Sequence, residues 1–461
     1  MKKLRNVLLI VVMAICMTVS MQAKTEQNAV KPEDTKVKFT VVGDFILKPD
    51  GTLWAMGDNK NGRLSKDVAE DMIGRPIQIM KDVAFIGGEG YAEDDEHFRE
   101  AYILKKDGTL YLFGKELEKV MDKVSFVNDD FIVDKEGKVY VWGNAQNSTQ
   151  LQEDLDVTFE ENLSGFFCHK PKLVKGLSNV KQIAYEIDWT PTGRSILGSG
   201  NGTLLILKKD GTLEGKYNIC IREGEIVTNG NQIKPIMKDV KSIECVGAVN
   251  MVIKKDNSLW AWGSTIYGSF GGGIDQTLSE PTKILDDVKT MYASFLNSFA
   301  LTNKGDIYAW GFNQLASFSD DEGRFYKFPN GGYVDLLGVD GFYFVALNKD
   351  NRVWMYGLDP ASEATEHYDK EGNYVENSEM HIGAFGTDKA NTHLGGYDFK
   401  SAYSFDKAVA IGVGNTDGDY ATYALDKEGR VWVWGTRFHI INADGTEGKS
   451  TRRPFVLIDN K

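Results

Sequence analysis

A short motif returns eight times along this chain, and the repetition limits the folds available to it. Each copy has a charged turn built on Asp-Gly, Glu-Gly or a related pair, followed by alternating apolar and aromatic residues. One copy reads IKKDNSLWAWG and ends at Gly263. The copies end at Gly57, Gly114, Gly143, Tyr217, Gly263, Gly311, Gly357 and Gly435. Self-similarity of this kind indicates one repeat architecture rather than several unrelated domains.

The repeat unit predicts four short strands. The turn pairs tolerate positive φ and are typical of two-residue hairpins. Apolar strands precede the turn, the earlier one usually opened by valine, as in 240–246, and a strand that often contains proline follows, as in 75–80. In the third strand Leu259 falls on one face, and Trp260 and Trp262 on the other. Both faces are apolar, which is the condition of a blade stacked between neighbours in a β-propeller.

The sequence therefore predicts an all-β fold, a β-propeller of four-stranded antiparallel blades over residues 37–461. Eight motifs predict eight blades. The C-terminal RRPFVLIDNK is similar to GRPIQIMKD, which elsewhere runs straight into a valine-opened strand, and such a strand stands at residues 37–43. We expect the N- and C-terminal strands to share one blade and so close the ring, because an open ring leaves two sheet edges unpaired.

Twenty repeat residues are expected to be structural: glycines at turns and strand ends, and tryptophans packed between blades. The fourth copy departs most, with LEGKY in place of an aromatic-glycine ending. The set is Gly51, Trp54, Gly57, Gly108, Gly114, Gly137, Trp142, Gly143, Trp260, Trp262, Gly263, Gly305, Trp310, Gly311, Trp354, Gly357, Gly429, Trp432, Trp434 and Gly435.

The pattern D-G-x-[VL]-[WY]-x-[WFY]-G resembles the repeat of the regulator of chromosome condensation family. The resemblance covers residues 37–461. It implies a propeller that acts as an interaction platform, as secreted bacterial relatives do, and it makes seven blades the alternative to eight. The GQLG tail of the family repeat is mostly absent, with NGRLS at residues 61–65 as its nearest trace.

The first residues read as an export signal. Lys2, Lys3 and Arg5 precede a short apolar stretch, and small residues follow. We expect a signal peptide at 1–23, a polar linker at 24–36, and a protein secreted or held in the periplasm or cell envelope of a bacterium. The apolar stretch is too short to favour a membrane anchor. The position of Cys16 inside it argues against lipid attachment.

The net charge limits the classes of partner, and the cysteines give no sign of a disulfide framework or a metal site. Lys and Arg number 53 and Asp and Glu 66, a net charge of −13, which argues against nucleic acid and anionic membranes as partners. After export three cysteines remain, Cys168, Cys220 and Cys245. They form no disulfide framework and no metal pattern. A Cys220–Cys245 bridge is conceivable, and three buried thiols are the simpler reading.

The connections predict one plain face and one decorated face. In an antiparallel meander, successive connections alternate between the two ends of a blade. The turns after strands two and four are uniformly short, so all length variation falls on the other end, where function is commonly placed. Within one such segment, YDKEGNYVE at 368–376 predicts an extra β-hairpin. The variable segments are 86–100, 144–170, 186–202, 264–280, 312–332, 358–398, 412–420 and 436–452.

Aromatic residues in these segments are the candidates for a binding face, because aromatic anchors with a polar rim are typical of protein recognition. The candidates are Trp189, Tyr91, Phe98, Tyr267, Phe270, Tyr326, Phe438 and His439. All six histidines lie there too, but no spacing among them matches a metal-ligand set. We expect no catalytic residues, no cofactor and a monomer.

Two functions remain open at this stage. The first is a non-enzymatic exported propeller that binds a partner protein through the decorated face. The second is an extracellular carbohydrate-binding or glycan-processing propeller, for which the loops hold enough Asp, Glu and Tyr to supply the two carboxylates of a glycosidase. The absence of a recognisable catalytic constellation favours binding.

Overall fold

The structure is a computed structural model that describes residues 37–459, with gaps. The longest gaps are 89–100, 144–169 apart from Leu155, 188–201, 264–277, 312–325 and 358–404 apart from 367–368 and 374–375.

The described strands form eight successive antiparallel blades. Seven of the eight blades have four strands each, and the remaining one, blade 7, has three. Blades 1 to 4 comprise β1 (Thr40–Val42), β2 (Phe45–Leu47), β3 (Leu53–Asp58) and β4 (Met72–Met80); β5 (Val83–Gly87), β6 (Ala101–Lys105), β7 (Leu110–Phe113) and β8 (Leu117–Met121); β9 (Val124–Val127), β10 (Phe131–Asp134), β11 (Val139–Val141) and β12 (Lys172–Leu173); and β13 (Val180–Ile187), β14 (Gly202–Lys208), β15 (Leu213–Lys216) and β18 (Lys234–Met237).

The second half of the chain repeats this order. In blade 7, a single bridge from Val353 to Phe405 continues the sheet beyond its third strand. Blades 5 to 8 comprise β19 (Val240–Val246), β20 (Val249–Lys254), β21 (Leu259–Gly263) and β22 (Leu278–Leu285); β23 (Val288–Ala293), β24 (Asn297–Thr302), β25 (Ile307–Gly311) and β26 (Tyr326–Lys327); β27 (Tyr333–Val339), β28 (Tyr343–Asn348) and β29 (Val353–Gly357); and β32 (Ala408–Thr416), β33 (Asp419–Asp426), β34 (Val431–Ile441) and β35 (Glu447–Ile458).

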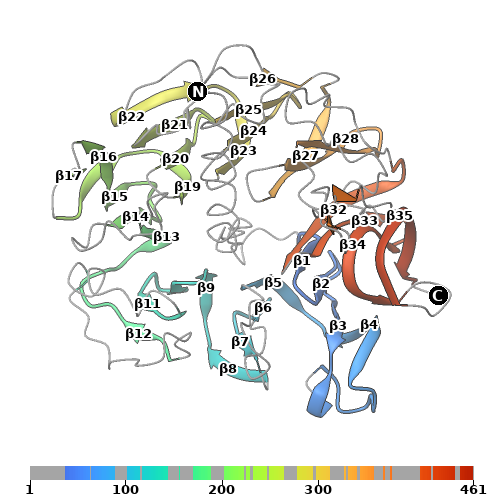
Figure 1. Cartoon of the computed structure of the whole chain (residues 1–461). Coiled ribbons are helices and arrows are strands. Elements are labelled where there is room, and N and C mark those ends of the chain that lie inside the picture. The colour runs from blue at the N-terminus through green and yellow to red at the C-terminus, as the bar shows by residue number, and fades with distance from the viewer. Residues whose placement is uncertain are drawn as a thin grey trace.

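The blades are arranged around a central axis, with the first strand of each blade innermost and the last at the rim (Figure 1). Blade 8 (red) lies beside blade 1 (blue), so the ring is complete. The predicted eight-bladed propeller is confirmed, and the seven-bladed alternative is excluded.

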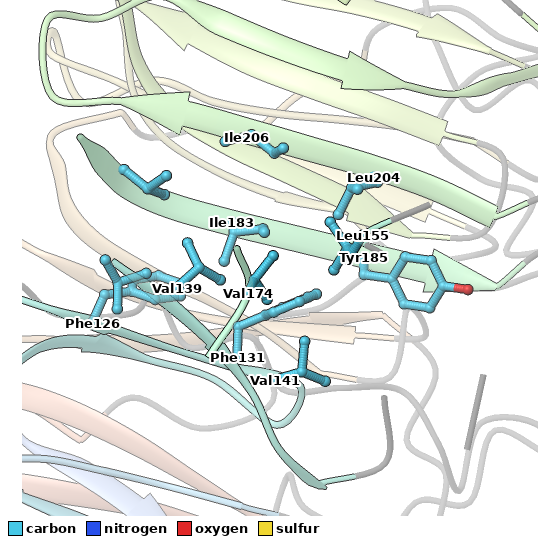
Figure 2. Packing of buried hydrophobic residues seen from close by; sticks show 12 residues of the cluster. Phe126, Phe131, Val139, Val141, Leu155, Val174, Ile183, Tyr185, Leu204 and Ile206 are labelled. Carbon is cyan, nitrogen blue, oxygen red and sulfur yellow. The ribbon is translucent and has the colours of Figure 1, made fainter. Parts of the chain in front are cut away.

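The core consists of apolar layers between neighbouring blades. Between blades 3 and 4, Phe131, Val139 and Val141 face Ile183 and Leu204 (Figure 2). Every one of these side chains is fully buried. Sheets buried on both faces explain why the sequence shows so little polar alternation along the strands.

The tryptophans of the third strands divide into two groups. Trp142, Trp262, Trp310 and Trp434 are at most 1% exposed and lie in interblade clusters. Trp262, for example, packs toward blade 4, whereas Leu259 and Ala261 of the same strand pack toward blade 6. The other group is half-buried and consists of Trp54, Trp260, Trp354 and Trp432. In blade 4, Lys216, 1% exposed, takes the place that a buried tryptophan holds in blade 5.

Hydrogen bonds join each blade to the next at one end of the propeller, which we call the turn face. The N–H of Val83 in β5 donates to the carbonyl of Gly51 in the hairpin turn of blade 1, over 3.0 Å. The N–H of Lys106 donates to Asp82 in the crossover (2.8 Å), and its Nζ donates to the Asp50 carbonyl (3.3 Å). Equivalent ammonium bonds run from Lys135 to Asp107, Lys209 to Lys135 and Lys255 to Asp210.

The expectation that the first and last strands share a blade is wrong. β1 pairs with β2 in blade 1, and β35 pairs with β34 in blade 8. The tight segment after each fourth strand is a crossover between blades, not a hairpin turn. Its αL residue, such as Asp82 with φ 59°, redirects the chain, and its backbone groups bond to the turns of neighbouring blades. Each blade is therefore one continuous stretch of sequence.

Side-chain packing closes the ring instead. A Cβ added at Gly412 in β32 would lie 3.0 Å from Cγ2 of Val41 in β1, so the two strands touch closely. Phe39 and Val41 share a cluster with Tyr423 and Val433 of blade 8. Blade 8 and blade 1 are not joined by a crossover. In six other blades the second residue of the hairpin turn donates its N–H to a crossover carbonyl. In blade 1 this residue is Pro49, which has no N–H and so leaves no donor unpaired.

A buried carboxylate organises the hairpin turn of blade 8. Asp426 accepts hydrogen bonds from Trp432 Nε1 at 2.8 Å and from the guanidinium and backbone N–H of Arg430 at 2.7 and 2.9 Å. Burial alone would raise the pKa of Asp426, but these hydrogen bonds outweigh it and lower the pKa below its ordinary value. Asp426 also acts electrostatically on Lys48 of blade 1, across the closing interface.

Replacing this carboxylate should give a pH-dependent loss of stability. We expect Asp426→Asn to lower the free energy of unfolding by about 1–3 kcal/mol at pH 7, since hydrogen bonds to a charged acceptor are lost. A lowered folded-state pKa contributes stability above the unfolded pKa, near 3.9, and that contribution disappears as pH falls through the folded value. Urea denaturation of both proteins between pH 7 and pH 3 should show the difference narrowing below about pH 4. An equal difference at every pH would contradict this assignment.

Candidate binding face

The long connections gather at the end of the propeller opposite the turn face, which we call the loop face. The hydrogen bonds on the turn face join the turns after second strands to the crossovers after fourth strands, so the other two connections of each blade share the opposite end. This confirms the predicted division into a plain and a decorated end.

Several segments expected to be loops are partly strand. Within 412–420, residues 412–416 belong to β32 and residues 419–420 to β33, and the last pair of this hairpin is Thr416 and Asp419. Residues 436–452 contain the far half of the β34–β35 hairpin, paired out to Ile441 and Glu447. Gly435, expected to end its strand, lies within β34 at φ 102°. In blade 8, β34 and β35 therefore continue beyond Gly435 as a two-stranded hairpin.

Two further hairpins lie in connections of the loop face. β16 (Asn218–Arg222) and β17 (Glu225–Thr228) pair with each other between the third and fourth strands of blade 4. β30 (His367–Tyr368) and β31 (Tyr374–Val375) pair within the connection after β29, so the extra hairpin predicted at 368–376 is confirmed. The β16–β17 hairpin was not predicted, because the fourth repeat ends in LEGKY and lacks the aromatic-glycine pair that marks the end of the third strand elsewhere.

The predicted binding residues fall into two sets. Tyr326 lies in β26, where its backbone pairs with Ala309, and Phe438 and His439 lie in the extended part of β34. The remaining candidates fall outside the described residues: Trp189, Tyr91, Phe98, Tyr267 and Phe270. The proposed role of both sets stays a prediction.

Residues 59–71 form a loop on this face, and the buried side chain of Asn59 holds it in place. Asn59 is 2% exposed. Its Oδ1 accepts the N–H groups of Leu64 and Ser65, both at 2.9 Å. Its Nδ2 donates to three carbonyls, at distances of 3.3, 3.1 and 3.0 Å, those of Ser65, Val68 and Glu70. One side chain thus replaces the backbone pairing that the loop lacks. The sequence signal was Asn59 itself, a polar residue directly after β3, but sequence reasoning missed it.

Asn59→Asp should open this loop without unfolding the blades. The carboxylate keeps the acceptor for Leu64 and Ser65, but it faces three carbonyl oxygens where the amide donated. We expect a loss of about 2–4 kcal/mol in local stability, from several unmet buried groups. Limited proteolysis should cut within 59–71 at least tenfold faster, with an almost unchanged melting temperature. As a control, Lys66→Gln changes the charge of the same loop by the same amount at an exposed position and should be cut at the wild-type rate. Equal acceleration by both variants would contradict the role of Asn59.

Metal, thiol and membrane features add little within the described part of the chain. No group of three or more His, Cys, Asp or Glu residues there could hold a metal ion. Cys245 is a buried free thiol in β19, and the side chain of Cys220 is not among those described. No described helix is long and apolar enough to span a membrane.

The repeat has recognisable sequence relatives. The chain is 24% identical over 317 residues to the human E3 ubiquitin-protein ligase HERC2, covering 58% of this chain and 6% of the ligase. It is 22% identical over 191 residues to the mitochondrial RCC1 domain-containing protein RUG3 of Arabidopsis thaliana, covering 39% of this chain and 38% of that protein. No family model matches the chain. The chain thus spans only a minor part of these relatives, which support an RCC1-type repeat.

A solved structure with a similar fold is Prp20p from Saccharomyces cerevisiae, described together with its binding to Gsp1p and histones. It is 20% identical, with a TM-score of 0.43, covering 63% of this chain and 76% of that one.

Proposed function

We propose that this chain is an exported, non-enzymatic propeller that binds a partner protein through its loop face. The observation that carries the proposal is the one-sidedness of the molecule. The turn face uses short, nearly identical turns whose backbone groups are bonded to neighbouring blades. The loop face carries every long connection, two inserted hairpins and the extension of blade 8.

A rigid ring with variable segments on one end suits recognition, because loops on a fixed scaffold pay less ordering entropy on binding. The relatives with RCC1-type repeats support a propeller of this kind, but their own activities are not carried over. Export is proposed from the N-terminal sequence, with Lys2, Lys3 and Arg5 ahead of the apolar stretch.

The test is capture followed by measured affinity. Residues 24–461, immobilised, would be exposed to envelope and medium extracts of the source organism, and captured proteins identified by mass spectrometry and remeasured after purification. We expect Trp189→Ala and the double variant Phe438→Ala/His439→Ala to weaken binding at least tenfold, as anchors of an interface do. Lys81→Ala, an exposed residue on the turn face, is the control and should bind as wild type does.

Other results would redirect the proposal. Capture of a specific glycan in place of a protein would support the carbohydrate function. Equal binding by loop-face and turn-face variants would contradict the assignment of the face.

Export is tested separately, by determining the N-terminal sequence of the protein recovered from medium and envelope. This sequence should begin near Lys24. Intact Met1 in the cytoplasm would overturn it.

A further inference from the structure

One residue holds the same place in the hairpin turn of every blade. It is the residue that ends the second strand, and its N–H donates to the carbonyl four residues later, as Thr302 does to Asp306 over 2.9 Å. In five blades its side chain also reaches the side chain six residues later, in the third strand. These pairs are Lys48 and Trp54, Asp134 and Tyr140, Lys208 and Glu214, Lys254 and Trp260, and Asp426 and Trp432.

In two of these pairs an ammonium group lies over an aromatic ring. Lys48 Nζ is 5.7 Å from the centroid of the Trp54 ring, and Lys254 Nζ is 5.5 Å from that of Trp260. Both distances are within the range of a cation–π interaction. The third-strand aromatic residue of a blade is therefore a place where this fold accepts an alkylammonium group.

Blade 6 departs from this pattern and contains a cavity at the same place. Thr302 is too short to reach Tyr308, and its Oγ1 instead accepts the N–H of Asp306 over 3.0 Å. The cavity has a volume of about 500 Å³, within the usual range of small-ligand sites. It is lined by residues 283–287 of blade 5 and its crossover, and by Thr302, Lys304, Asp306 and Tyr308 of blade 6.

The lining of the cavity is one positive charge short of the equivalent residues around blade 5. The nine lining residues include two lysines and three aspartates, a formal charge of −1. The strand registers place their counterparts at 235–239, 254, 256, 258 and 260, which include two lysines and two aspartates and are neutral. Thr302 lies where Lys254 lies in blade 5, so the missing charge corresponds to the ammonium group of that lysine.

Two ion pairs lie beside the cavity and leave it open. Lys283 Nζ is 2.6 Å from Oδ1 of Asp286, and Lys327 Nζ is 2.8 Å from Oδ2 of Asp306. Lys327 also lies 5.9 Å from the centroid of the Tyr308 ring, but it is not one of the residues that line the cavity. The space between Thr302 and the ring therefore remains available to another cation.

The other lining residues suit a cation with an alkyl chain. Oδ1 of Asp287 accepts a hydrogen bond from Asn303 Nδ2 over 2.9 Å, whereas its Oδ2 is buried and has no partner among the described residues. Lys304 is exposed, so solvent screens its charge. Ile284 and Leu285 are half-buried and add apolar surface.

We propose that this cavity binds the alkylammonium group of a second molecule. The ammonium group lies over the Tyr308 ring, as that of Lys254 lies over Trp260, and the alkyl chain contacts Ile284 and Leu285. A free amine and the lysine side chain of another protein both carry this chemistry. The site is at the turn face, so it is independent of the partner proposed for the loop face, and each proposal can fail without the other.

Fluorine NMR of the fluorotyrosine-labelled protein tests the site, with n-butylammonium as the probe. We expect titration to shift the Tyr308 resonance, which is identified by its loss in Tyr308→Phe. The uncharged n-butanol and an equal ionic strength of sodium chloride should leave that resonance in place. A lysine derivative blocked at both backbone ends separates the two sources. Tighter binding than n-butylammonium supports a lysine side chain as the natural ligand, and equal or weaker binding supports a free amine.

Substitutions that move the repeat pattern between blades locate the binding. Thr302→Lys should occupy the cavity, as Lys254 occupies the same place in blade 5, and raise the dissociation constant at least tenfold. Asn303→Lys adds the same charge at the next residue, which is exposed and does not line the cavity, and should weaken binding far less. Lys254→Thr should create a second site, seen as a shift of the Trp260 resonance in fluorotryptophan-labelled protein that the wild type does not show.

Three results would overturn the proposal. The first is a Tyr308 resonance that n-butylammonium does not shift. The second is equal weakening by Thr302→Lys and Asn303→Lys, because added charge would then explain the loss without a cavity. The third is a Lys254→Thr protein that gains no second site while its melting temperature stays normal.

Discussion

Gly137→Ala should destabilise the propeller by about 2–5 kcal/mol, whereas Gly176→Ala should cost about 1–2 kcal/mol. The two glycines have nearly the same backbone, φ 84° and φ 83°, so a side chain meets the same conformational penalty at both. They differ in space. A Cβ at Gly137 would lie 2.9 Å from Cα of Asn179 and from the backbone N of Val180, whereas nothing lies within 4 Å of one at Gly176.

The clash matters because it falls on backbone. Val180 begins the first strand of blade 4, and its N–H donates to the Gly137 carbonyl over 3.1 Å. Relief of the contact would pull the crossover away from the turn and lengthen this bond. Urea denaturation followed by tryptophan fluorescence measures both variants, with comparable m-values required for the comparison. Equal shifts in the midpoint would mean that φ alone sets the cost and that the turn face tolerates displacement.

The buried tryptophans should give the largest losses. We expect Trp142→Ala and Trp434→Ala each to lower the free energy of unfolding by about 3–5 kcal/mol, the usual cost of emptying a large buried site. Trp142 packs edge-on against Tyr102, with ring centroids 5.6 Å apart, and Trp434 lies 5.7 Å from Phe405. Trp54→Ala, at a half-buried position, should cost clearly less.

Phenylalanine at the same two sites separates packing from hydrogen bonding. Trp142 Nε1 donates to the Asn128 carbonyl over 2.7 Å, whereas Trp434 Nε1 is buried without a partner among the described residues. Trp142→Phe should therefore cost about 1–3 kcal/mol more than Trp434→Phe, because it leaves a buried carbonyl unmet. Thermal and urea denaturation give both values. A larger loss for Trp434→Phe would show that ring shape outweighs the hydrogen bond.

The strands, turns and blade number could be predicted because they follow from side-chain pattern. A third strand with Leu259 on one face and Trp262 on the other has to lie between two neighbours, and the structure places it there. Ring closure could not be predicted the same way. Whether the segment at Asp82 is a hairpin or a crossover depends on which carbonyl groups its backbone N–H groups bond to. The pattern of apolar residues does not specify these hydrogen bonds.

The candidate site was less accessible to prediction for a related reason. Its position follows from connection length, a property of the sequence, and the structure agrees. The identity of its binding residues does not follow from connection length. An aromatic side chain in a variable segment packs against the propeller or points into solvent depending on its neighbours, and these neighbours are not set by the repeat. Asn59 shows how such a segment is ordered by one buried amide rather than by a repeating pattern.

Because every blade is continuous in sequence, a cut at any crossover leaves all of the sheets intact. A chain opened at the crossover between Met80 and Val83, with residue 459 linked to residue 37, would contain the same eight sheets in rotated order. Circular permutants should therefore fold, and gain or loss of one repeat by recombination would add or remove a whole sheet rather than leave half of one. In a ring whose terminal strands shared a blade, gain or loss of a repeat at either end of the chain would disrupt that composite sheet.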